Sequence, residues 1–91
     1  MKKIPRRDKM KIYGDLLAAI SEEAKSQKII LTRVQVRINV PYDRLKGYIS
    51  ELKELQLIRN DASLEITDKG RKYLKEYKRI IDFMKYMGLT Y

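Results

Sequence analysis

The sequence predicts a mainly helical fold with a small β-hairpin and an extended last helix. Two long segments, residues 9–26 and 68–87, carry apolar residues at the spacing of amphipathic helices. Between them, two short β-forming runs, residues 57–59 and 64–66, flank four residues typical of turns. With 91 residues, the chain is expected to form one domain around a single modest core.

The first predicted helix follows a basic segment, residues 1–8, which we expect to form an N-terminal arm. Asp8 occupies the position of an N-cap for this helix. Its apolar stripe consists of Ile12, Leu16, Leu17, Ala19, Ile20 and Ala24. Gly14 interrupts the helix at a cost of up to about 1 kcal/mol relative to Ala, and it could allow a neighbouring element to pack closely.

Residues 33–40 fit two interpretations. Polar and apolar residues alternate strictly, and the apolar ones are β-branched, which favours a strand. Leu31, Val34 and Ile38 also lie at helical spacing. Thr32 could cap the first turn of such a helix, and Asn39 tolerates the left-handed conformation that ends one. Periodicity alone leaves both interpretations open.

Pro41 predicts that a new helix begins directly after this segment. Proline suits the first turn of a helix and biases the preceding Val40 toward an extended conformation. A short helix, a tight turn at residues 39–40 and a second helix together form a helix-turn-helix. The predicted buried stripe of the second helix is Leu45, Tyr48, Ile49 and Leu52.

The last helix is predicted to begin after Thr67 as N-cap and to end before Gly88. Its apolar stripe extends to Met87, about 30 Å from its start, which is longer than a small domain needs.

Composition excludes several classes of function. The chain has no Cys and no His, so it lacks disulfides, thiolate chemistry, the commonest metal ligand and the usual general base. We therefore expect no enzymatic activity, no metal and no cofactor, and no residue set indicates a small-molecule ligand. No segment approaches the roughly 18 apolar residues of a membrane span, and the basic N-terminus lacks the apolar stretch of a secretory signal. These features predict a cytoplasmic protein without a membrane partner.

The net charge of +9 is divided into three basic blocks separated by acidic segments. Residues 1–11, 28–50 and 67–91 carry net charges of +5, +4 and +4, and the two intervening segments each carry −2. This segregation is expected of a protein that binds the phosphate backbone of nucleic acids.

The ordered motifs resemble the small archaeal winged-helix proteins that include the ten-kilodalton chromatin-associated DNA-binding proteins. The residues that carry the resemblance, over about residues 10–80, are Thr32-Arg33-Val34, Asn39-Val40-Pro41-Tyr42, Tyr48 with Leu52, Leu57-Ile58 and Ile66-Thr67-Asp68-Lys69-Gly70. The resemblance implies a helix-turn-helix, a two-stranded wing and a last helix that pairs with a second copy. It favours helix for residues 32–38. The chain departs from the family where Gln56 replaces the usual Gly between the third helix and the wing, and the last helix extends only about two turns beyond the globular part.

The predicted partners are double-stranded DNA and a second copy of the chain. The second helix of the helix-turn-helix is the predicted recognition helix, which would enter the major groove. Arg44 and Lys46 flank its exposed face, and Gly47 would let its backbone approach DNA. Arg33 and Arg37 share a face in either interpretation of their segment. The predicted DNA contacts are Lys2, Lys3, Arg6, Arg7, Arg33, Arg37, Tyr42, Arg44, Lys46, Gly47, Ser50 and Arg59. The predicted dimer interface consists of Tyr77, Ile80, Ile81, Met84 and Met87.

The predicted organisation is a basic arm over residues 1–8, a winged-helix domain over 9–76 and a dimerising extension over 77–91. The expected function is nucleoid-associated DNA binding in transcriptional regulation or chromatin. One alternative uses the winged helix only as a scaffold for protein–protein interaction. Another takes residues 29–40 as the β-ribbon of a ribbon-helix-helix dimer.

Overall fold

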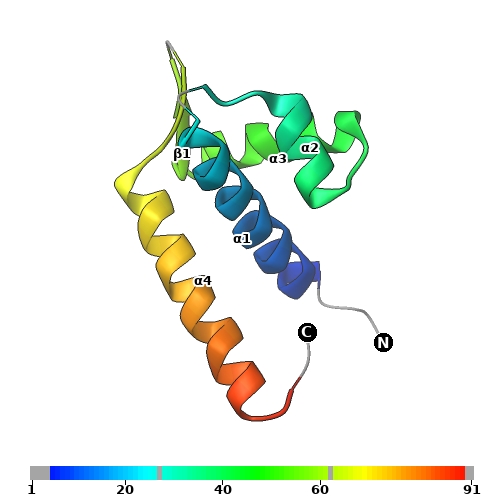
Figure 1. Cartoon of the computed structure of the whole chain (residues 1–91), viewed down its shortest axis with the longest axis vertical. Coiled ribbons are helices and arrows are strands. Elements are labelled where there is room, and N and C mark those ends of the chain that lie inside the picture. The colour runs from blue at the N-terminus through cyan, green and yellow to red at the C-terminus, as the bar shows by residue number, and fades with distance from the viewer. Residues whose placement is uncertain (1–4, 27, 62, 90–91) are drawn as a thin grey trace.

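The computed structural model describes residues 5–26, 28–61 and 63–89, and it has the predicted mainly helical architecture with one antiparallel hairpin (Figure 1). The elements are α1 (Pro5–Ala24), α2 (Leu31–Ile38), α3 (Tyr42–Glu54), β1 (Ile58–Asn60), β2 (Leu64–Ile66) and α4 (Asp68–Tyr86). In Figure 1, α1 lies between α4 on one side and α2 with α3 on the other. No helix among these residues combines the length and apolar character that crossing a membrane requires.

Helix α1 begins earlier than the sequence pattern predicts. It starts at Pro5 rather than Lys9, so Asp8 lies inside the helix and is not its N-cap. Proline is favoured at the first helical position because its missing N–H would have no partner there and its φ is already helical. The prediction of a separate arm is therefore wrong for residues 5–8. Residues 1–4 lie outside the described part of the chain.

The segment with two sequence interpretations forms a helix, α2. In α2, Val34 is fully buried and Val36 is 78% exposed, although a strand would place both on the same face. Thr32 is not the N-cap, because α2 begins one residue before it and Ile30 occupies the cap position without a side-chain hydrogen bond. Asn39 ends the helix in the predicted left-handed conformation, with φ 54°, and its N–H bonds to the carbonyl of Gln35.

Helix α3 follows the predicted turn, with Pro41 at its N-cap position. Three of its predicted stripe residues, Leu45, Ile49 and Leu52, are buried. After the end of α3, Gln56 adopts the left-handed conformation, with a φ of 64°. Two backbone hydrogen bonds close this end, from the N–H of Gln56 to Lys53 O at 2.9 Å and from the N–H of Leu57 to Leu52 O at 2.9 Å. The left-handed helix end therefore forms without the glycine that the resemblance leads one to expect.

The wing and α4 are joined by a close contact at Gly70. Strands β1 and β2 pair with Ile58 opposite Ile66. The side chain of Thr67 caps α4 by accepting a hydrogen bond from the N–H of Gly70 at 3.0 Å, as predicted. A Cβ at Gly70 would collide with the backbone carbonyl oxygen of Leu57, so this position packs α4 directly on the residue that precedes β1.

The core lies where α1 meets the other elements. It is formed by Leu16, Leu17, Ala19, Ile20, Val34, Leu45, Ile49, Leu52, Leu57 and Ile58. On its α4 side, the ring of Tyr77 packs on Gly14, where a Cβ would collide with the ring. The close packing suggested by Gly14 in the sequence is thus observed. With α1 held on this side, α3 keeps one face buried and the opposite face free.

Candidate nucleic-acid interface

Helix α3 presents a continuous exposed face. Its exposed residues are Tyr42, Asp43, Arg44, Lys46, Gly47, Ser50, Lys53 and Glu54. All the residues of α3 that were predicted to contact DNA are in this set. The helix-turn-helix therefore leaves the predicted recognition surface accessible, as binding in a major groove would require.

The exposed face has a distinct arrangement of charge. At 100° per residue, the line farthest from the buried residues Leu45, Ile49 and Leu52 consists of Asp43, Gly47, Ser50 and Glu54, here called the central line. Lys46 and Lys53 lie along one side of it, and Arg44 lies along the other. The cations thus flank the face, and its centre contains small and acidic residues.

Tyr42 and Lys46 contact one another at the start of this face. The Lys46 Nζ lies 5.8 Å from the centroid of the Tyr42 ring, within the range of a cation–π interaction. The ring is exposed rather than packed beneath the turn. The tyrosine ring therefore lies beside the lysine ammonium on the exposed face of α3.

Gly47 leaves open space at the centre of the face. A Cβ built at this residue meets no atom within 4 Å. Packing within the chain therefore does not explain the glycine, and the space above it can admit a ligand surface close to the helix backbone.

The flank of α3 that carries Arg44 is tied to α1 through Glu51. Its Oε1 accepts a short hydrogen bond from the Tyr13 hydroxyl and another from Lys9 Nζ at 3.0 Å. These two donors hold the pKa of the Glu51 carboxyl below its ordinary value, and the Tyr13 hydroxyl has the larger effect. Burial together with the Glu51 hydrogen bond raises the pKa of Tyr13. The hydrogen bond to Glu51 also raises the pKa of the Lys9 ammonium. This network links α3 to α1 beside the exposed face.

Arg33 and Arg37 of α2 bind a buried carboxylate that the sequence analysis did not identify. Glu23 of α1 is 3% exposed, and its Oε2 accepts a hydrogen bond from Arg37 Nε at 2.7 Å. Its Oε1 lies 3.9 Å from Arg33 Nη1 and makes no hydrogen bond within the described part of the chain. A buried carboxylate is costly unless it is paired, so the two arginines stabilise the α1–α2 contact. The sequence signal for the burial of Glu23 was its position three residues after Ile20, on the buried stripe of α1.

The wing contributes little free positive charge. Arg59 of β1 lies directly opposite Glu65 of β2, and its Nη2 is 3.2 Å from the Glu65 carboxylate. The pair is exposed, and within it the charge of the one wing arginine is balanced.

The remaining predicted DNA contacts are N-terminal. Arg6 and Arg7 lie in the first turns of α1, and Lys2 and Lys3 are outside the described residues.

The predicted dimer residues divide into two groups. Tyr77 is 8% exposed because it packs on Gly14, so it offers little surface to a partner. Ile80 and Met87 are exposed, while Ile81 and Met84 are half-buried. Phe83, 60% exposed, was missed although it lies between Ile80 and Met87 at helical spacing.

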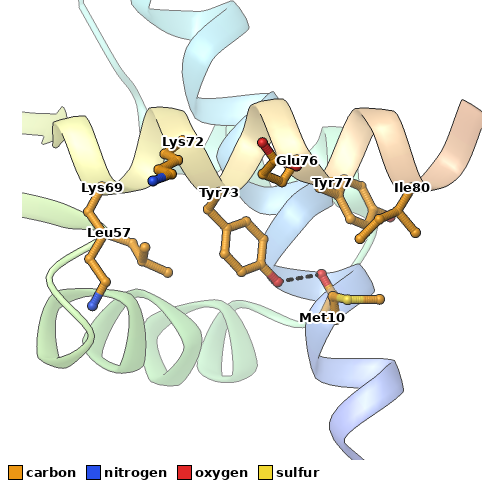
Figure 2. Close-up of a pocket in the computed structure, with 8 residues that line it drawn as sticks. All are labelled: Met10, Leu57, Lys69, Lys72, Tyr73, Glu76, Tyr77 and Ile80. Atoms are coloured by element: carbon orange, nitrogen blue, oxygen red, sulfur yellow. Dashed lines mark hydrogen bonds between the residues drawn. The ribbon is translucent and has the colours of Figure 1, made fainter.

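An apolar pocket of about 320 Å³ adjoins this stripe (Figure 2). It lies in the angle between α4 and the first half of α1, with Leu57 and Ile80 in its wall. Tyr73 projects from α4 toward α1, and its hydroxyl donates a hydrogen bond to the carbonyl of Met10 at 2.9 Å. Because Ile80 belongs to both features, the pocket and the exposed stripe form one continuous apolar surface.

Residues 9–26, 28–61 and 63–89, whose side chains are described, contain no group of three acidic residues placed to hold a metal ion. A family model described as winged helix-turn-helix matches residues 6–85. Domains of this kind typically bind DNA and are not enzymes. No match to the chain was found among curated proteins or among solved structures.

Proposed function

Because the chain belongs to the winged helix-turn-helix family, we propose that it binds double-stranded DNA as a homodimer, with α3 in the major groove. The observation that carries this proposal is the free face of α3, flanked by cations and open above Gly47. The proposed setting is the cytoplasm, in association with the nucleoid, as a transcriptional regulator or chromatin protein.

The available cations support contacts centred on α3. Arg44, Lys46 and Lys53 form no ion pair within the described part of the chain, so their charges are free to meet phosphates. The arginines of α2 and β1 each have a carboxylate partner, which lowers the electrostatic gain from moving them to DNA. We therefore expect the largest phosphate contributions from α3 and smaller ones from Arg33, Arg37 and Arg59.

The decisive experiment compares two double variants with the same change in charge. Replacing Arg44 and Lys46 by Glu should abolish binding to a short duplex in a fluorescence anisotropy titration. Replacing Lys75 and Lys78 by Glu, two exposed lysines of α4 that do not line the pocket beside Tyr73, should weaken binding only modestly. Equal losses in both variants would show that α3 is not the interface, and no wild-type binding at low salt would refute DNA binding altogether.

Salt dependence measures how many phosphates are contacted. If a dimer neutralises about six phosphates, the logarithm of the binding constant should fall with the logarithm of salt concentration at a slope near −5. A slope near zero would contradict a phosphate-binding function.

The homodimer is supported by the apolar surface of α4. Ile80, Phe83 and Met87 lie on one side of the helix and continue into the pocket beside Tyr73. A second copy is the proposed occupant because an antiparallel α4 would present the same apolar stripe, as an isologous interface requires. Two copies would then present two α3 helices to successive major grooves.

Sedimentation tests this interface separately from DNA binding. Phe83→Glu should convert the dimer to a monomer, since a charge in the paired stripe would be desolvated. Tyr86→Glu is the matched control, because Tyr86 is also exposed on α4 but points about 100° away from the stripe. A monomeric wild-type protein at micromolar concentration would refute the homodimer and leave the α3 proposal standing.

The alternative function is a protein-interaction module, which the same α4 surface favours because another protein's apolar helix could cover it. This alternative predicts that the Arg44 and Lys46 double variant retains all of the protein's binding partners.

A further inference from the structure

The residues at the centre of the α3 face are poorly suited to binding phosphate groups. The central line places Asp43 and Glu54 farthest from the core, with Gly47 and Ser50 between them. A helix that only adsorbed to the DNA backbone would gain most from cations at these positions, because each acid repels phosphates. The role of the acidic residues is therefore not phosphate binding.

The major groove gives these positions two different environments. A helix lying in the groove has its flanks nearest the phosphate walls and its centre nearest the base edges. Arg44 and Lys46 would thus meet phosphates on opposite sides, while Asp43 would face bases. The N-terminal residues of a recognition helix contact base edges, and Asp43 lies in the first turn of α3.

The side chain of Asp43 is available for such a contact. It is exposed and forms no hydrogen bond or ion pair within the part of the chain that the structure describes. One turn further, Gly47 leaves open the space through which the α3 backbone could approach the groove floor. An ionised carboxylate only accepts hydrogen bonds, and the cytosine N4 amino group is the donor in the major groove that acidic side chains recognise.

We propose that α3 selects its DNA sequence and that Asp43 is a specificity-determining residue, accepting a hydrogen bond from the N4 amino group of a cytosine. The proposal rests on the DNA-binding function proposed above. The target is accordingly a duplex with a C·G pair at a fixed position opposite the first turn of α3, and not DNA of any sequence.

The experiment measures sequence preference for the wild-type protein and for Asp43→Ala, Asp43→Asn and Glu54→Ala. Each protein is bound to a library of short duplexes of randomised sequence, and the bound fraction is sequenced. The wild-type protein should enrich a C·G pair at one position of each half-site by about tenfold over the other base pairs, the size of one specific contact. Asp43→Ala should lose the preference at that position alone.

The two other variants separate base contact from charge. Asp43→Asn should shift the preference toward adenine, since an amide pairs with the adenine N6 and N7. Glu54→Ala removes the same charge from the other end of the central line. Like Asp43→Ala, it should bind random DNA more tightly than the wild-type protein, but it should keep the wild-type preference.

If Asp43 were only a favourable charge at the helix N-terminus, Asp43→Ala would lower the melting temperature without changing the preferred base. Wild-type binding with no sequence preference, or an unchanged preference in Asp43→Ala, overturns the specificity role. Absence of any wild-type binding instead refutes the underlying DNA-binding function.

Discussion

Gly47→Ala should make the protein more stable and a weaker DNA binder at the same time. In the free protein the added methyl group meets no atom within 4 Å, so it costs no steric strain. Position 47 is an exposed site in the interior of α3, where Ala is favoured over Gly by about 1 kcal/mol because it loses less backbone entropy. For a domain of this size, that gain raises the melting temperature by about 4–8 °C.

The effect on binding has the opposite sign because the same methyl group fills the space above the helix. If the α3 backbone approaches base edges there, the helix must withdraw from the groove, and we expect a loss of about tenfold in affinity, or about 1.4 kcal/mol. Circular dichroism melting gives the first quantity, and fluorescence anisotropy with the preferred duplex gives the second.

Two results would refute this reasoning. A lower melting temperature would show that position 47 is not open in the free protein. A higher melting temperature with unchanged affinity would show that DNA does not approach the α3 backbone at this residue.

Three further predictions concern the fold that supports α3. Gly70→Ala should reduce the free energy of unfolding in urea by about 3 kcal/mol or more, because its Cβ would collide with the backbone carbonyl of Leu57; a neutral effect would contradict the packing of α4 on the wing. Gln56→Gly should raise the free energy of unfolding by about 1 kcal/mol by relieving the left-handed conformation, and a decrease would argue against that backbone geometry. Glu51, whose pKa is lowered on folding, stabilises the protein fully above the ordinary pKa of 4.5 and loses this contribution as the pH falls through its lower folded value. The melting temperatures of wild type and Glu51→Gln should therefore converge in acid, whereas a constant difference would mean that the carboxylate charge contributes nothing.

The sequence by itself determined the elements whose signals are local. Pro41 located the turn between α2 and α3, and Thr67 located the start of α4, because a fixed φ and a side-chain cap act within a few residues of themselves. The apolar stripe of α3 likewise identified both its buried face and, by exclusion, its exposed face. These signals were sufficient to predict the fold class and the exposed residues of α3.

The local pattern did not decide between strand and helix for residues 33–40, where the family resemblance favoured helix, and the tertiary structure supplies the physical reason. The alternating pattern is compatible with both, and the helix is selected because it buries Val34 against the core while Val36 stays in solvent. Pairings between distant residues were equally hidden, since neither Glu23 nor its two arginines carries a local signal for the other. The contact between Tyr77 and Gly14 was hidden for the same reason. The sequence predicted Tyr77 as an interface residue, but its ring is buried on Gly14 within its own chain. Local chemistry thus specified the helices and turns, whereas long-range packing determined which of their charged and apolar side chains remain free to bind a partner.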